Sequence, residues 1–289
     1  MKQPYGVMVA QMILVHLVGV RISVGLPFFL FFSGVMFMKI FLSLLISCVI
    51  FTAVSAENPA ERRGAVCFTF DDYHGANWVK ADAIFKKYDA HATFFIVREI
   101  TPERAEVMKT LQAAGHTVGL HSRSHRNAHP LPDGWNEDKY IANQILPQLE
   151  SCKKFGIKVR SFAYPNNRRN EKTDQMLFKY FDYLRAGWGK PQQPVYTPLA
   201  DLPSKMVLAG GGIGKYYKSD LNNLKSLLDE AHKRDALIVF FSHNITPKAK
   251  SIHMPTEMLE ELLKHARKLN MNIVGAEELP GLKASRTKK

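Results

Sequence analysis

The chain has 289 residues, of which 46% are hydrophobic and 11% aromatic, and its formal net charge is +13 at pH 7. This length supports one substantial core and excludes, as a first expectation, two domains plus an export segment. The positive charge suits nucleic acid, an anionic cell-wall polymer or a membrane surface, and charge alone does not choose among them. No nucleic-acid-binding motif accompanies the charge, so we expect no nucleic-acid partner.

The N-terminal region is apolar almost throughout. From Met38 the chain has one basic residue, an apolar stretch and the small residues Val54-Ser55-Ala56, a pattern typical of a secretory signal peptide. We therefore expect residues 38–56 to be a signal peptide and the protein to be exported to a bacterial periplasm, cell envelope or exterior. A competing cue is Cys48, which ends a stretch similar to a lipoprotein cleavage box, although apolar residues continue beyond it.

Residues 1–37 have two open interpretations. They are either an extension from a misassigned start or a first membrane segment, since the run from Val7 to Phe37 is long enough to span a bilayer. Any membrane contact is therefore expected only through this segment.

The remaining sequence predicts a single domain with short flanks. Residues 57–64 are expected to be a polar linker, residues 65–280 the main folded domain and residues 281–289 a basic tail. The exported part keeps only Cys67 and Cys152, so no disulfide framework is expected. We expect a monomer.

Short apolar runs alternate with helical patterns after the linker, and this alternation predicts an α/β fold with parallel strands. Strands are expected over Ala65–Phe70, Ala92–Val97, Thr117–Leu120, Ser161–Tyr164, Tyr183–Ala186, Met206–Ala209, Leu237–Phe241 and Asn272–Val274. Helices are expected over Asn77–Tyr88, Pro102–Ala114, Glu137–Phe155, Glu171–Tyr180, Asp220–Lys233 and Thr256–Leu269. Loops are expected at Lys190–Ser204 and at the glycine run Gly210–Gly214, where glycines mark a turn or a close backbone approach.

The expected strands lack period-two alternation, which indicates burial on both faces, as in a barrel or a doubly wound sheet. Polar residues follow four of the strand ends: Asp71 and Asp72, His121 to His125, Pro165 to Asn167, and His243. The carboxyl ends of parallel strands are where such folds build their sites. We therefore expect these residues to meet at one rim.

Two motifs at this rim carry metal chemistry. Asp71 and Asp72 are adjacent and point differently, so one can bind a metal while the other faces water, although such a pair also caps helices and turns. His121 and His125 have the i, i+4 spacing that puts both imidazoles on one face if the segment takes a helical turn. Three ligands of this kind with an open position are typical of catalytic zinc sites.

In combination, these motifs resemble the polysaccharide deacetylase family, whose domain is also called the NodB-homology domain. The resemblance rests on Thr69-Phe70-Asp71-Asp72, Ala92 to Val97, Gly115 to Gly119 and the His121 to His125 motif, and it extends over about residues 65–275. It implies a distorted (β/α) barrel of the carbohydrate esterase type.

The resemblance also implies roles for individual residues. Asp71 would be the catalytic base, Asp72, His121 and His125 the metal ligands, and His243 the general acid after the strand at Leu237. The expected cofactor is a divalent metal, Zn²⁺ in the first place, with Co²⁺ or another transition metal as alternatives.

The third family motif departs from its usual form here. Its arginine position holds Ala163, which leaves Arg160, Arg168 and Arg169 as candidates to orient Asp71. Residues implied for the oxyanion site or the substrate groove are Asn166, Pro165, Tyr164, Trp188 and Tyr73, and the loops 127–136 and 190–204 are expected to line that groove.

The function that follows is removal of N- or O-linked acetyl groups from a polysaccharide, with an acetylated glycan as partner. Two alternatives stay open. The altered third motif allows a non-catalytic, metal-holding carbohydrate-binding relative, and the same fold allows an amidase for small molecules.

Overall fold

The computed structural model describes residues 62–189, 193–249 and 252–286, with side chains up to Lys283. The expected N-terminal extension, the signal peptide, most of the linker and the last residues of the tail therefore lie outside the described residues. None of the helices in these ranges is long and apolar enough to cross a membrane.

Parallel strands close into a barrel. The order is β1 (Ala65–Phe70), β2 (Thr93–Ile96), β3 (Thr117–Leu120), β4 (Ser161–Ala163), β5 (Tyr183–Gly187), β7 (Met206–Gly212) and β8 (Ala236–Ser242), and β8 pairs again with β1. The short β11 (Asn272–Ile273) is parallel to β1, and β6 (Thr197–Pro198) is antiparallel to β8. A separate pair joins β9 (Asn244–Ile245) and β10 (His253–Met254). The predicted distorted (β/α) barrel is confirmed.

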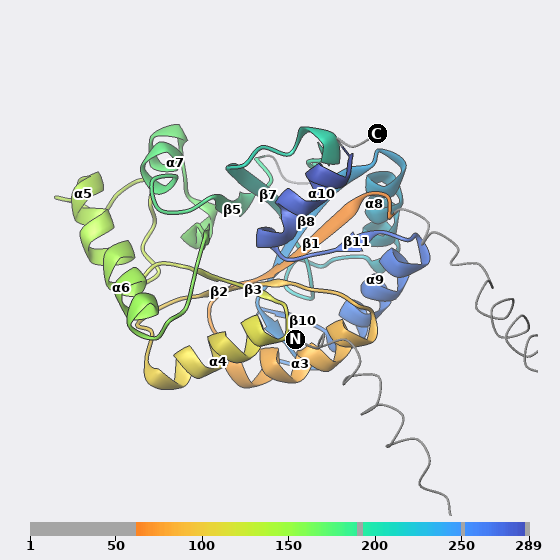
Figure 1. The fold of residues 1–289 in the computed structure, drawn as a ribbon, viewed down its shortest axis with the longest axis horizontal. Helices are drawn as coiled ribbons and strands as arrows, with labels where there is room; N and C mark the ends of the chain where they lie inside the picture. The colour runs from red at the N-terminus through yellow and green to blue at the C-terminus, as the bar shows by residue number, and fades with distance from the viewer. Residues whose placement is uncertain (1–61, 190–192, 250–251, 287–289) are drawn as a thin grey trace, which may run out of the picture. The chain divides into compact units, whose positions relative to one another are not determined.

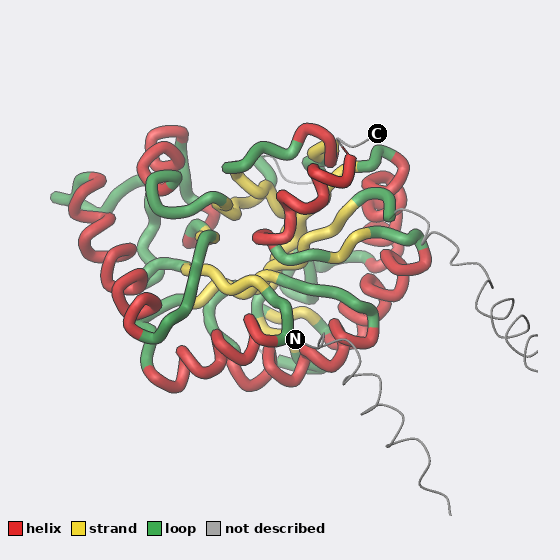
Figure 2. The backbone as a smooth tube through the Cα atoms, in the orientation of Figure 1, coloured by secondary structure: helices red, strands yellow, loops and turns green. Residues whose placement is uncertain are grey.

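Helices surround these strands, as Figures 1 and 2 show. Their bounds are α3 (Gly75–Lys87), α4 (Pro102–Ala113), α5 (Glu137–Tyr140), α6 (Leu146–Lys154), α7 (Glu171–Leu177), α8 (Leu221–Lys233), α9 (Thr256–Lys268) and α10 (Leu279–Arg286). Side-chain caps start several of them, since Thr101, Asn170 and Asp220 accept hydrogen bonds from the first turns of α4, α7 and α8. Short 3₁₀ turns lie at Pro165–Asn167, Leu199–Asp201 and Ala276–Glu278.

The helix predicted over 137–155 is divided by a π-helical segment, Ile141–Ile145, between α5 and α6. Pro147 stands in the first turn of α6 and has no N–H to donate. Its ring also clashes with an ordinary α-helical carbonyl four residues earlier. A π turn before the proline allows the chain to continue in nearly the same direction.

Alternation along the strands divides the core into two layers. On β1, Val66, Phe68 and Phe70 pack under the helices, whereas Ala65 and Cys67 point into the barrel. Both layers are buried, as the continuous apolar runs predict. Because successive side chains alternate, Asp71 continues the interior row at the end of β1.

The glycine run is placed differently from the prediction. Gly210, Gly211 and Gly212 form the end of β7 and are not in a loop. A Cβ atom on Gly211 would lie 2.5 Å from the ring of Trp188, and one on Gly212 would lie 2.6 Å from the ring of Tyr217. The glycines therefore allow two aromatic rings to lie directly against the strand, and only the expectation of a close backbone approach is confirmed.

Candidate active site

The residues that follow β1, β3 and β8 meet at the carboxyl end of the barrel. Asp72 Oδ1 lies 3.7 Å from Nε2 of His121 and 3.6 Å from Nε2 of His125. The other oxygen of Asp72 lies 3.8 Å from Nε2 of His243. One carboxylate thus faces three imidazoles from two further strand ends.

The geometry of Asp72, His121 and His125 fits a metal ion. Each offers one ligand atom, and these atoms lie within 4.8 Å of one another. A tetrahedral zinc ion with bonds of about 2.0–2.2 Å holds its ligand atoms about 3.4 Å apart. The side chain of His121 is 2% exposed, whereas those of Asp72 and His125 are 40% and 39% exposed, so the group is open on one side.

The two histidines converge through left-handed backbone and not through the helical turn that their spacing suggests. Residues 121–125 are not helical, and φ is +62° at Ser122 and +56° at His125. Asp72 has φ +74°. Non-glycine residues rarely adopt this region, and where they do it often marks a functional site.

The tautomer of His121 is fixed by its neighbour on β4. Its Nδ1 lies 2.8 Å from the carbonyl oxygen of Ala163, so Nδ1–H donates and Nε2 keeps its lone pair toward Asp72. Burial is the main cause that lowers the pKa of His121 to about 4, and the charge of Arg185 acts in the same direction, against the opposing charge of Asp71. The imidazole is therefore neutral at pH 7, which is the form that binds metals.

Asp71 is held by an arginine that the sequence analysis did not identify. The Arg185 guanidinium donates to Asp71 Oδ2 and to the side chain of Asn167. Arg185 is fully buried, and Asp71 is 3% exposed. Burial alone raises the pKa of Asp71, but the charge and the hydrogen bond of Arg185 oppose this effect, and the pKa is held below its usual range.

The three arginines expected at this place lie elsewhere. Arg160 pairs with Asp182 and Arg169 with Asp174, and Arg168 has no contact with Asp71 among the described residues. The sequence feature that could have identified Arg185 is the strand Tyr183 to Gly187, in which this arginine interrupts an apolar run. A charge buried in a strand requires a buried partner.

The expected groove residues divide into buried and accessible ones. Tyr164 is fully buried and donates to Asp174, and Pro165 is buried beside it, so neither lines a groove. Strand alternation explains this correction, because Phe162 and Tyr164 both point toward the helices. Asn166 is exposed, has φ +53° and donates to the side chain of Asn127.

Tyr73 and Trp188 each line a cavity, and the two cavities have no lining residue in common. Tyr73 lines a cavity with Asp72 and His125. Trp188 lines a larger cavity of about 760 Å³ with Tyr217, and its Nε1 has no hydrogen-bond partner within the described ranges. Burial, in the first place, and the negative charge of Asp71 together raise the pKa of Tyr217 to about 12.

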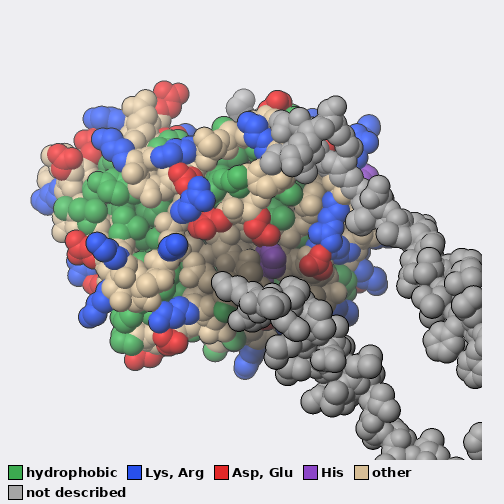
Figure 3. Space-filling view, viewed as in Figure 1, with side chains coloured by type: hydrophobic (Ala, Val, Ile, Leu, Met, Phe, Trp, Pro, Cys, Tyr) green, Lys and Arg blue, Asp and Glu red, His purple; other side chains and the backbone are tan. Residues whose placement is uncertain are grey.

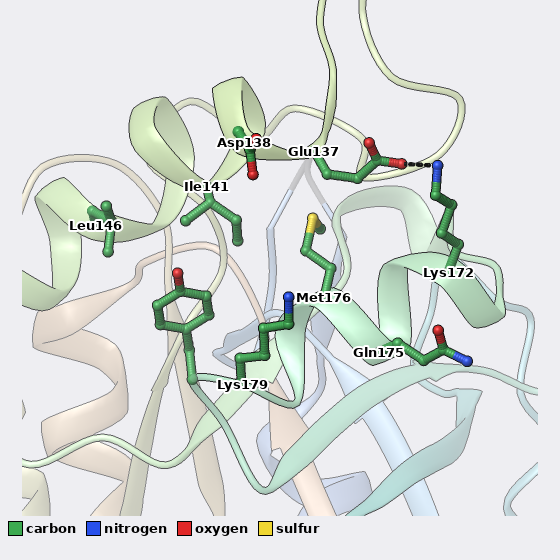
Figure 4. A pocket seen from close by; sticks show the side chains of 9 residues that line it. Glu137, Asp138, Ile141, Leu146, Lys172, Gln175, Met176 and Lys179 are labelled. Carbon is green, nitrogen blue, oxygen red and sulfur yellow. Dashed lines mark ion pairs between the residues drawn. The ribbon is translucent and has the colours of Figure 1, made fainter.

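Another cavity, of about 560 Å³, lies between α5 and α7 (Figure 4). Ile141 and Met176 supply apolar surface, and Lys172 pairs with Glu137 at its edge. The residues at the strand ends do not line it. We therefore place the candidate active site at Asp71, Asp72 and the three histidines.

Comparison with known proteins agrees with this geometry. Residues 58–180 match the family model described as polysaccharide deacetylase, which confirms the resemblance drawn from the motifs. A peptidoglycan-N-acetylglucosamine deacetylase of Bacillus cereus is 37% identical over 83 residues, which are 29% of this chain and 30% of the relative. The alignment thus spans less than a third of that curated relative.

Solved structures share the fold at low identity. A Mycobacterium smegmatis protein assigned to the polysaccharide deacetylases gives a TM-score of 0.54 at 14% identity, covering 79% of this chain and 93% of its own. A mutant of a CE4 family pseudoenzyme with restored enzymatic activity gives 0.50 at 18% identity, covering 76% and 68%. Both show similarity of fold alone.

Proposed function

We propose that this chain, a member of the polysaccharide deacetylase family, is a divalent-metal-dependent hydrolase that removes acetyl groups from a glycan. The observation that carries the proposal is the division between the two adjacent aspartates. Asp72 faces three imidazoles, whereas Asp71 is buried against Arg185. One carboxylate suits a metal, and the other suits proton transfer.

Asp72, His121 and His125 would hold the metal, with Zn²⁺ or Co²⁺ as first candidates. When bound, the ion supplies a Lewis acid that polarises the acetyl carbonyl and lowers the pKa of water. That contribution matters here because Asp71, with its lowered pKa, is a weak base toward ordinary water.

The protein residues account for the protons of the reaction. Asp71 has one buried oxygen, Oδ1, without a hydrogen-bond partner among the described residues, and this is the oxygen that would accept a proton from the attacking water. His243, whose Nε2 faces Asp72 from the β8 side, donates a proton to the leaving nitrogen or oxygen. Water adds to the acetyl carbon, and acetate and a free amine or alcohol leave.

Location and domain limits belong to the same proposal. The relative's cell-wall substrate supports an extracytoplasmic glycan as the partner, with residues 38–56 as the export signal. Residues 65–280 would be the catalytic domain of a monomer. The backbone N–H of Asn166 is the candidate donor to the oxyanion.

A non-catalytic carbohydrate-binding protein is the second candidate. It is favoured by Ala163 in place of the usual arginine and by the shared fold of a pseudoenzyme. The buried pair of Arg185 and Asp71 favours the enzyme, because an ionised base inside a barrel needs such a partner.

The test measures acetate released by the full chain from chitin oligosaccharides, peptidoglycan and acetylated xylan. The protein is stripped with a chelator and then supplied with zinc or cobalt, beside Asp71→Asn and His125→Ala. Metal-dependent release that both variants lose supports the hydrolase. Metal binding without release from any glycan supports the second candidate.

A further inference from the structure

Three neighbouring cavities extend outward from the metal triad. The first, of about 370 Å³, is lined by Asp72, His125 and Arg98. The second, of about 350 Å³, shares Arg98 and His125 with the first and adds Arg123. The third, of about 360 Å³, shares Arg123 with the second and ends at Trp135. We call this row of cavities the arginine trough.

Arg98 stands where the first two cavities meet, and its main chain is held on both sides. Its N–H donates to the carbonyl of Ser122, at 3.1 Å, and its carbonyl accepts from Nε2 of the buried Gln148, at 2.6 Å. Immediately before it, the N–H of Val97 donates to the carbonyl of Asp72, at 2.8 Å. Arg98 is thus joined to both loops that carry the triad.

This backbone is also strained. Arg98 has φ +71°, a conformation that costs a non-glycine residue of the order of 1 kcal/mol. Its side chain is exposed, and among the described residues it has no hydrogen-bond or ion-pair partner. A strained, fixed backbone with an unpaired guanidinium beside His125 is the kind of arrangement that a ligand explains.

Positive charge dominates the trough. Four arginines line it, namely Arg98, Arg104, Arg123 and Arg126, against the single Glu99 apart from the triad itself. Glu99 pairs with Arg123, and Arg104 lies over the ring of Tyr73 at 4.2 Å. Arg98 and Arg104 line the same cavity. Basic side chains are also spread over the face seen in Figure 3.

The far end of the trough is suited to a sugar ring. Trp135 is half-buried there, and the ammonium group of Lys139 lies 5.8 Å from its ring centre. An aromatic face beside polar groups is a common platform for stacking. The trough thus has residues of the Asp72, His121 and His125 group at one end, the Arg98 guanidinium in the middle and an aromatic ring at the other end.

We propose that the arginine trough binds the carboxylate of a sugar next to the acetylated one, so that the substrate is an acidic glycan. This inference rests on the proposed deacetylase function and adds a substrate class to it. A guanidinium group receives a carboxylate through two parallel hydrogen bonds, and Arg98 is the one placed to do so beside the triad. Arg98 is a specificity residue that takes no part in the transfer of protons.

The experiment compares three tetrasaccharides. In two of them N-acetylglucosamine alternates with a carboxylate-bearing N-acetylated sugar, once as the free acid and once as its methyl ester, and the third is the neutral N-acetylglucosamine tetramer. Acetate release is measured with wild type, Arg98→Gln, Arg98→Lys and the control Arg234→Gln. Arg234 lies on the surface after α8 and pairs with Glu230, so its variant removes the same charge away from the trough.

We expect wild type and Arg234→Gln to prefer the free acid over its ester by about 10- to 100-fold in kcat/KM, mainly through KM. Arg98→Gln should lose that preference, so that its kcat/KM is about equal on the free acid and the ester, and the preference of Arg98→Lys should fall between those of wild type and Arg98→Gln. Equal rates of wild type on acid and ester would overturn the carboxylate subsite while leaving the deacetylase intact. Release from none of the three would instead count against the proposed function.

A phosphate is the other anion that a guanidinium fork accepts. An acetylated glycan with phosphodiester groups, added as a competitor, separates the two. If this competitor inhibits wild type more strongly than the free acid does, and no longer inhibits Arg98→Gln, the trough binds a phosphate and not a carboxylate.

Discussion

Ala163 and Arg185 are register partners on the neighbouring parallel strands β4 and β5. Ala163 occupies the position at which the family resemblance implies an arginine. Arg185, on the next strand β5, donates a hydrogen bond from its guanidinium to Asp71. Both residues follow the row of side chains that points into the barrel, since Phe162 and Leu184 beside them pack under the helices. The arginine is therefore present, on the adjacent strand.

This relationship predicts a rescue. Arg185→Ala should reduce deacetylation by about 100-fold or more, because the base loses its orientation. It should also destabilise the fold by about 3–5 kcal/mol, because Asp71 stays buried without a partner. Adding Ala163→Arg to Arg185→Ala should restore a large part of the activity and of the stability. Activity is measured as acetate release, and stability as the free energy of unfolding in urea.

The single Ala163→Arg is the control for this rescue. In wild type it places a second large cation beside Arg185 in a closed interior, so it should destabilise the protein and restore nothing. A double variant no better than Arg185→Ala would show that Arg185 cannot be replaced from β4.

Metal removal gives the second prediction. The chelated protein should lose activity, and zinc should raise its thermal midpoint in proportion to RT ln(1 + [Zn]/Kd). His125→Ala should weaken zinc binding strongly, by calorimetry, while folding normally, since the side chain is 39% exposed. The matched control is His265→Ala, which removes a surface histidine paired with Asp229. An unchanged zinc affinity in His125→Ala would remove this residue from the triad.

The sequence was sufficient for the barrel and for the residues at its rim, because apolar runs and polar strand ends are local patterns. Arg185 could not be assigned in this way, since its role depends on the register between β4 and β5 and on a partner 114 positions away. The left-handed conformations at Ser122 and His125 were equally hidden, because the spacing of two histidines does not reveal the backbone between them. The prediction that Tyr164 lines the groove is wrong, because a motif position does not show which way a side chain points. Strand alternation turns Tyr164 toward the helices.

The third prediction concerns the dependence of stability on pH. His116 is 4% exposed, its Nδ1 accepts from the N–H of Ala92, and its Nε2 lies 3.2 Å from Asp82. Burial lowers its pKa to about 4, even though Asp82 opposes the shift. Between pH 4 and the ordinary value of about 6.5, the unfolded chain binds more protons than the folded one. The contribution of His116 is thus complete above pH 6.5 and is lost as the pH falls toward 4.

The measurement compares wild type with His116→Asn by urea unfolding at several pH values from 7 to 4.5. Asparagine can still accept from Ala92 and does not titrate in this range. Below pH 6 the stability of wild type should fall relative to the variant by about 1.4 kcal/mol per pH unit. If the free energy of unfolding of wild type and of His116→Asn changes with pH in the same way, His116 binds its proton equally in the folded and unfolded states, and the prediction is wrong.

The fourth prediction concerns the glycine at the end of β7. Gly211→Ala would place a Cβ 2.5 Å from the ring of Trp188, so the indole must move or the strand must shift. Overpacking of this kind costs about 1–3 kcal/mol. Gly189→Ala is the matched control, because no atom lies within 4 Å of its added Cβ among the described residues. Gly211→Ala should lower the thermal midpoint and shift tryptophan fluorescence, whereas Gly189→Ala should do neither, and equal behaviour of the two would show that Trp188 does not lie against this strand.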